Sequence, residues 1–543
     1  MKITKALAPV LTLALAIPAG WAAAAPAPAA APTAVTPAAD LRASLDHLLS
    51  EHFALAVAAM TKAYDGSKDA AAALKALDQN ALDMLPAIEM LYGKAGADEF
   101  GRIFRSHNAS TDELAKAKKM NNADAVKAAE AKVQGFVDEF STFLAAATAN
   151  NLPKAAAMDA LKLHEAQVQT VFDEYVQGDY ADAYKAYREG YKTMFTISKA
   201  LSGAIVKQMP DKFGGSSVDT KAADLRSTLN RLVSEHVALS VLQMQKQFDG
   251  AKDASALVGA EAMNTADWKA AIASLYGSAG ADAFEKLWTG DHINAQSDYV
   301  NAVKAGDMAA KQAVQARFNT FSKDFGSFLG TATEGKLPAA AATEALLKHE
   351  SQIQMAFDSY AAGNYDAAYA TDREGFKFVF GVGQGLGDAI VKQKPSMFAE
   401  ATPAPTPTPT PAPVEPSMTT VWMKLNSMQL NINGGTTQMD TTPVMWNGMT
   451  YIPLRFLSEG IGATVSFDGK AKAVWISAGS DKLGFWVNQK TYSVNGQSMT
   501  APAAPVIDKN GRTLVPLRFI AELLDWNVAF AAKDGSITLT QMN

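Results

Sequence analysis

The chain contains an internal duplication, and this repeat constrains the fold more than any other feature of the sequence. The segment "DLRASLDHLLSEH" at 40–52 returns as "DLRSTLNRLVSEH" at 224–236, and "LYGKAGADEF" at 91–100 returns as "LYGSAGADAF" at 275–284. The two copies are 184 residues apart up to about residue 106 and 185 apart after it, so the second copy has one extra residue. A repeat of this length predicts two homologous modules, over residues 40–213 and 224–398.

Each module has the apolar spacing of α-helices. Residues on one face of a helix recur every three or four positions, and two segments of the first module follow this rhythm closely. The abundance of alanine agrees with helix, and Pro153 and Pro338 stand where helices are expected to begin. We expect four to six helices per module, packed as an antiparallel bundle. The residues that carry the rhythm are Leu41, Leu45, Leu48, His52, Leu55 and Ala59, and then Leu161, His164, Val168, Val171 and Tyr175.

The C-terminal part has a different pattern and a repeat of its own. The segments "TYIPLRFLSEGIGATVSFDGKAKAVWIS" and "TLVPLRFIAELLDWNVAFAAKDGSITL" lie 63 residues apart. Each predicts a strand, a short helix and two strands around an Asp-Gly turn. The fold class expected for the whole chain is therefore multidomain: two tandem all-α helical bundles, then a C-terminal α+β domain with duplicated strand-helix-strand units.

The paired "PLRF" at 453–456 and 516–519 carries a resemblance to a known family. Residues 420–541 resemble the copper amine oxidase N-terminal-like domain, also called a stalk domain. The resemblance implies a non-catalytic appendage of exported bacterial proteins. It does not imply oxidase activity, because copper amine oxidases use three histidines and a tyrosine-derived quinone in a separate domain. Residues 420–543 contain no histidine, and we expect that the chain is not an enzyme.

Three further segments suggest export and spacing. Residues 1–25 combine Lys2 and Lys5 with an apolar run and small residues, which predicts a secretory signal peptide. Residues 26–39 form a Pro/Ala tether, and residues 399–417 form a Pro/Thr-rich linker with an extended polyproline II path. We expect a secreted protein at the surface of a bacterium, with no transmembrane span after signal removal.

Charge and cysteine content narrow the possible partners. The formal net charge is −6 and the chain has no cysteine. A nucleic-acid partner is not expected, because such proteins carry basic patches. The absence of cysteine excludes disulfides and thiolate metal sites. The expected partner is a cell-envelope component or another protein.

Six of the seven histidines form three duplicated pairs: His52 with His236, His107 with His292, and His164 with His349. Most of them occupy apolar stripes where the helical rhythm otherwise places leucine or valine, so we expect them to point inward. A glutamate stands next to each histidine of two of these pairs. Neighbouring residues of a helix point about 100° apart, so we expect these glutamates at the edge of the cleft that the histidines face. Imidazoles and carboxylates projecting into a bundle can hold copper, zinc or iron. The predicted metal ligands are His52, His107, His164, Glu51 and Glu165, and His236, His292, His349, Glu235 and Glu350.

Two interpretations of these histidines remain open at this stage. In the first, they are ligands of one ion per module, which requires the three imidazoles to meet within about 4–5 Å. Alternatively, each is a buried histidine held by a hydrogen bond, with tyrosines as the available partners. Three functions are compatible with these interpretations: a non-catalytic binding or display protein, a metal-binding protein and, third, a metalloenzyme. The candidate partners are Tyr175, Tyr184, Tyr187, Tyr360 and Tyr369.

Overall fold

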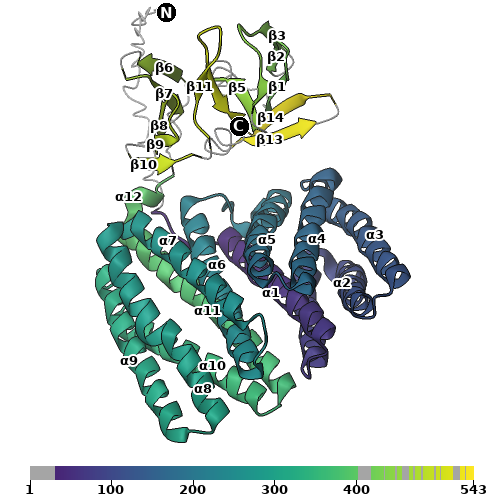
Figure 1. Cartoon of the computed structure of the whole chain (residues 1–543), viewed down its shortest axis with the longest axis vertical. Helices are drawn as coiled ribbons and strands as arrows, with labels where there is room; N and C mark the ends of the chain where they lie inside the picture. Colours follow the sequence, from purple (N-terminus) through teal and green to yellow (C-terminus); the bar gives the residue numbers. More distant parts are fainter. Residues whose placement is uncertain are drawn as a thin grey trace, which may run out of the picture. The chain divides into compact units, whose positions relative to one another are not determined.

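The computed structural model divides the chain between residues 403 and 404 into a helical unit and a strand-rich unit (Figure 1). The predicted signal peptide, residues 26–30 of the first tether, residues 401–417 of the second and the short helices expected after each "PLRF" lie outside the described residues. Residues 37–39 of the first tether form the first turn of a helix. The structure describes residues 31–400 and 418–542, except 433–434, 447–448, 455–463, 469–470, 479–480, 495–496, 502, 518–525 and 532–533.

The helical unit repeats one series of elements twice. The first module contains α1 (Pro37–Asp65), α2 (Ala70–Lys119), α3 (Ala123–Ala147), α4 (Lys154–Gln177), α5 (Tyr180–Gln208) and the 3₁₀ turn η1 (Pro210–Phe213). The second contains α6 (Lys221–Asp249), α7 (Ala254–Trp288), the π-helical turn η2 (Thr289–Ile293), α8 (Asn294–Ala305), α9 (Met308–Ala332), α10 (Ala339–Ala361), α11 (Tyr365–Gln393) and α12 (Pro395–Phe398).

Equivalent residues set the helix limits in both modules. The Thr36 hydroxyl accepts from the Ala39 N–H at the start of α1, and Thr220 caps α6 in the same way. Within α2 and α7 the chain bends at Gly93 and Gly277, whose φ angles are 75° and 76° with ψ near 180°. This conformation is essentially restricted to glycine, so the repeated "LYG" turns α2 back on itself.

The two modules pack on each other through reciprocal contacts. Arg42 contacts Asp224 at 2.5 Å and the Val218 carbonyl at 3.1 Å, and its counterpart Arg226 makes the same contacts with Asp40 and the Ala34 carbonyl. An interface in which residue i meets j and j meets i is isologous, as in a twofold-symmetric dimer. The helical unit is therefore a covalently joined pair of modules related by an approximate twofold axis.

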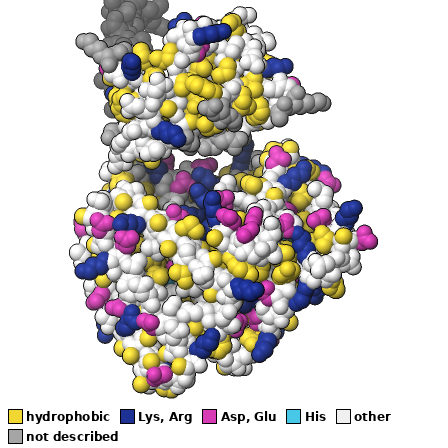
Figure 2. All heavy atoms as spheres, in the orientation of Figure 1, with side chains coloured by type: hydrophobic (Ala, Val, Ile, Leu, Met, Phe, Trp, Pro, Cys, Tyr) yellow, Lys and Arg dark blue, Asp and Glu magenta, His cyan; other side chains and the backbone are white. Residues whose placement is uncertain are grey.

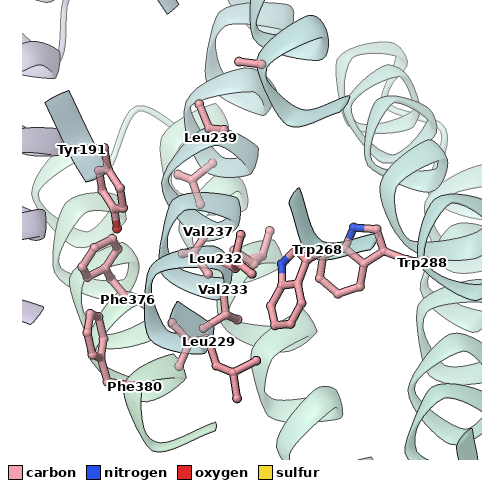
Figure 3. Packing of buried hydrophobic residues seen from close by; sticks show 14 of the residues in the cluster. Tyr191, Leu229, Leu232, Val233, Val237, Leu239, Trp268, Trp288, Phe376 and Phe380 are labelled. Atoms are coloured by element: carbon pink, nitrogen blue, oxygen red, sulfur yellow. The ribbon is translucent and has the colours of Figure 1, made fainter. Parts of the chain in front are cut away.

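A shared core accompanies these polar contacts. One cluster of buried apolar side chains runs through both modules, from Phe53 in α1 to Val391 in α11. Figure 3 shows Tyr191 of α5 next to Phe376 and Phe380 of α11, where two modules meet. The Tyr191 hydroxyl donates to Ser234 Oγ in α6 at 2.7 Å. None of the helices in the described part of the chain has the length and apolar character needed to cross a membrane.

The strand-rich unit contains antiparallel pairs throughout its described residues. Its three sheets have the orders β13-β14-β1-β2-β3, β10-β9-β8-β7-β6 and β11-β12-β5-β4. The strands are β1 (Met418–Lys424), β2 (Gln429–Ile432), β3 (Gly435–Gln438), β4 (Val444–Trp446), β5 (Met449–Pro453), β6 (Thr464–Asp468), β7 (Ala473–Ala478), β8 (Asp481–Trp486), β9 (Thr491–Val494), β10 (Gln497–Thr500), β11 (Val506–Ile507), β12 (Thr513–Pro516), β13 (Asn527–Ala531) and β14 (Ser536–Met542).

The repeat of this unit appears in its strand pairing. The two strands that lead into "PLRF", β5 and β12, pair with each other, with Val515 opposite Ile452. The two predicted hairpins also form, as β6–β7 and β13–β14. The expected fold class, helical modules followed by a stalk-type domain, is confirmed.

Candidate metal centre

Each module brings its three duplicated histidines together. In the first, His52, His107 and His164 each offer a ring nitrogen within 4.8 Å of those of the other two. In the second, the same holds for His236, His292 and His349. All six are at most 6% exposed, so the rings face the bundle interior and not solvent. Figure 2 shows one face of the molecule, on which basic and acidic side chains of the described residues are mixed and no histidine is visible.

Three different helices supply the three rings of each group. In the first module they come from α1, α2 and α4, and in the second from α6, the π-helical turn η2 and α10. Phenylalanine rings fix two of them: Phe136 stacks on His107 at 4.1 Å between centroids, and Phe321 on His292 at 4.5 Å. The ring orientations are thus set by packing, which is how proteins hold metal ligands in place.

Burial lowers the pKa of His52, His107, His164, His292 and His349. Loss of solvation lowers the pKa of His107 to about 3, of His164 to about 4 and of His349 to about 3. The same cause lowers the pKa of His52 and His292 well below 6.5, and the neighbouring imidazoles lower them further. Neutral imidazole presents a free lone pair, which is the form that binds a transition metal.

The glutamates after His164 and His349 lie beside the histidine groups. Glu165 Oε1 is 3.5 Å from His107 Nε2 and 3.9 Å from His164 Nε2, and Glu350 Oε1 is 2.6 Å from His292 Nδ1. Loss of solvation raises the pKa of Glu165 to about 8 and that of Glu350 to about 7. Both carboxyl groups therefore adjoin the imidazoles in a poorly solvated interior.

Glu51 and Glu235 lie elsewhere, and the expectation that they border the histidine cleft requires correction. Glu51 Oε2 accepts from Arg373 at 2.9 Å and from Asn80 at 2.7 Å, and Glu235 accepts from Arg188 and Asn264. Each arginine belongs to the other module. A residue next to an inward-facing histidine lies about 100° round the helix, and here that direction leads to the interface between modules.

One carboxylate near the second group was missed from the sequence. Glu261 of α7 is 1% exposed, and its Oε1 lies 2.5 Å from His236 Nδ1. The equivalent position in the first module is Leu77. A buried helical position that holds leucine in one copy and glutamate in the other is the signal that could have revealed it.

Four of the five tyrosines proposed as histidine partners bind aspartates instead. The hydroxyls of Tyr175 and Tyr360 donate to Asp65 and Asp249, each at 2.6 Å. Those of Tyr184 and Tyr369 donate to Asp253 and Asp69 of the other module. Among the described residues, the Nδ1 atoms of His52, His107 and His164 have no hydrogen-bond partner. The interpretation of the histidines as tyrosine-bound core residues therefore has no support in these contacts.

An apolar cavity adjoins the histidine group in each module. The cavity of the first module has a volume of ≈ 100 Å³, and its wall is apolar except for the three imidazoles, Ser44, Tyr92 and Thr148. The cavity of the second has a volume of ≈ 380 Å³ and is lined by His349, Trp268 and Trp288. An apolar shell of this kind excludes water and strengthens electrostatic interactions at a metal site.

The fold and the site together define a class of protein: paired helical modules, each with a buried three-histidine group, joined to a strand-rich domain. The protein-family model of the copper amine oxidase N-terminal domain matches residues 419–539 of the sequence. The strand-rich unit is thus a domain of this non-catalytic type, and the resemblance carried by the paired "PLRF" is confirmed. The match includes no catalytic domain of that enzyme class and does not extend to the helical modules. No curated protein and no solved structure matches the chain.

Proposed function

We propose that the chain is an exported, non-catalytic metal-binding protein in which each helical module holds one transition-metal ion, copper, zinc or iron. The observation that carries the proposal is that three buried imidazoles converge twice, at equivalent positions of the repeat. Metal–nitrogen bonds of about 2.0–2.1 Å place the ligands of one ion about 3.4 Å apart. From separations of up to 4.8 Å, each nitrogen would move toward the ion by less than about 1 Å.

The other parts of the chain support a role in display. The signal-like segment 1–25 suggests export, and the Pro/Thr-rich segment 399–417 suggests an extended spacer. The stalk-type domain would then engage a cell-envelope component or another protein, and the helical modules would carry the metal at the bacterial surface. Display without metal is the alternative function, and the following measurement separates the two.

The test is the metal content of the full chain after exposure to copper, zinc or iron and removal of excess metal. We expect about two equivalents in the unmodified chain, about one in His107→Ala and in His292→Ala, and none in the double variant. His47→Ala is the matched control, because His47 is partly buried, packs against Phe380 and lies outside both groups. Absence of metal from the unmodified chain, or an unchanged content in the double variant, would overturn the proposal.

A further inference from the structure

The two histidine groups occupy equivalent positions of the repeat, but they differ at one ring. A carboxylate contacts Nδ1 of His236 in the second group, and none contacts Nδ1 of its counterpart His52 among the described residues. Glu261 Oε1 lies 2.5 Å from His236 Nδ1, in a position where the first module has Leu77. His52 Nδ1, the counterpart of His236 Nδ1, has no hydrogen-bond partner within the described residues. The contact with Glu261 therefore fixes the tautomer of His236, and no equivalent contact fixes the tautomer of His52.

The extra residue of the second module lies in this site. Phe104 and His107 are three positions apart, whereas their counterparts Trp288 and His292 are four apart. The structure accommodates the insertion as the π-helical turn η2, which contains His292. A single inserted residue produces such a turn within an α-helix, and π-helical turns are frequent at functional sites.

The second group is also more compact. Its His292 Nε2 lies 2.9 Å from His236 Nε2, and the two ring centroids are 4.8 Å apart, against 5.7 Å for His52 and His107. With Glu261 at Nδ1, His236 turns Nε2 toward His292. The two nitrogens are hydrogen-bonded to each other, and they would move apart by about 0.5 Å to reach the separation of about 3.4 Å expected for ligands of one ion.

The equivalent glutamates approach different atoms in the two groups. Glu165 lies on the Nε2 side of His107, at 3.5 Å, while Glu350 lies on the Nδ1 side of His292, at 2.6 Å. Glu350 forms no hydrogen bond with His292 within the described residues, so the hydrogen-bonded carboxylate of the second group is Glu261, behind the ring of His236. Carboxylates in this position orient the imidazole and raise its basicity, and their loss typically lowers metal affinity about 10–100-fold.

We infer that the two modules bind metal with unequal affinity, that the second module fills first, and that Glu261 is a positioning residue responsible for much of the difference. This inference rests on the proposed function. The expected difference between the two dissociation constants is about 10–100-fold, the range found when a carboxylate behind a ligating imidazole is removed.

The test is a titration of the metal-free full chain with Zn²⁺, and with Co²⁺ as a spectroscopic probe. His107→Ala leaves the second site intact and His292→Ala leaves the first, so each variant reports one dissociation constant. We expect His107→Ala to bind about 10–100-fold more tightly than His292→Ala. Equal affinities would overturn the inference and leave the proposed function standing, whereas no binding by either variant would overturn both.

The role of Glu261 is tested in the His107→Ala background. Glu261→Leu, which introduces the residue of the first module, should weaken binding about 10–100-fold. Glu261→Gln still accepts from Nδ1 and should recover part of that loss, with the Co²⁺ spectrum unchanged because the three nitrogen ligands remain. Far-UV circular dichroism confirms folding of each variant.

The matched control is Glu285→Gln, which removes one negative charge from the same helix at a site that is 41% exposed. Its affinity should equal that of the parent. Unchanged affinity in both folded Glu261 variants, or an equal loss in Glu285→Gln, would overturn the role assigned to Glu261.

Discussion

Asp372 is a carboxylate in the interface between modules, at the position that Tyr187 occupies in the first module. Part of the residue reaches solvent, but its Oδ1 is buried and has no hydrogen-bond partner among the described residues. Loss of solvation, together with the nearby Glu51, raises the pKa of Asp372 to about 7.

This shift predicts a pH-dependent cost. Between pH about 4 and about 7 the folded chain keeps the proton of Asp372 and the unfolded chain releases it, so the group lowers stability as pH rises. Asp372→Asn should therefore raise the melting temperature at pH 8 and have little effect at pH 4. Thermal unfolding followed at 222 nm measures both. Asp366→Asn, at an exposed site of the same helix, is the control, and an equal effect of Asp372→Asn at both pH values would contradict the prediction.

Glu51 should matter for stability and not for metal. Its side chain is 3% exposed and binds Arg373, so Glu51→Gln removes the buried charge partner of a largely buried arginine and leaves it only the more exposed Asp83. We expect the free energy of unfolding to fall by about 3 kcal/mol, with metal content unchanged. Denaturant unfolding and metal analysis of the same sample check both parts.

Glu99→Gln is the control for Glu51, because the Glu99 side chain is 49% exposed and solvent screens its ion pair with Arg102, so its loss should change stability little. A loss of metal in Glu51→Gln would return Glu51 to the set of candidate ligands.

For single residues, the sequence predicts which way a side chain points on its helix better than it predicts what the side chain contacts. The helical rhythm places His52 and His164 inward, and both are buried. It places Glu51 about 100° away, but it cannot tell whether that direction meets a cleft or another module. Glu261 approaches His236 from a different helix, so the sequence offers only the difference between Leu77 and Glu261 in the two copies as a signal for it.

At the scale of elements, the repeat shows that one residue is inserted but not what the insertion becomes. A single extra residue can lengthen a loop or widen one helical turn, and only the structure identifies the π-helical turn η2 (Thr289–Ile293). The helices after each "PLRF" lie outside the described residues, so that part of the fold stays a prediction.

The π-helical turn predicts the result of a deletion. Removing Gly290, an exposed residue with open space around its Cα, should restore the regular α-helix that the first module has at this point. The chain should fold, and the Zn²⁺ affinity of the second site, measured in the His107→Ala background, should fall toward that of the first. An unchanged affinity in the folded deletion variant would show that the turn does not set the site geometry.

For the molecule as a whole, the reciprocal interface predicts joint unfolding of the modules. Arg188 and Arg373 each bind carboxylates of the other module, and one core runs through both. The helical signal at 222 nm should therefore disappear in a single transition. Two separate helical transitions in the unmodified chain would contradict this prediction.

A double variant tests the same coupling. Arg188→Met with Arg373→Met should lower the midpoint of that transition or divide it in two. The reason is that the buried carboxylates of Glu235 and Glu51 each lose the arginine that binds them from the other module. Arg102→Met, at a site that is 53% exposed, is the control and should leave the transition in place.

The approximate twofold axis also indicates how such a chain could arise. Two copies that meet through matching surfaces are what a self-associating ancestor of half this size would form. Joining them in one polypeptide makes their association independent of protein concentration. It also lets one half accept a substitution such as Leu77 or Glu261 without imposing it on the other, so that a symmetric pair can acquire a high-affinity and a low-affinity member.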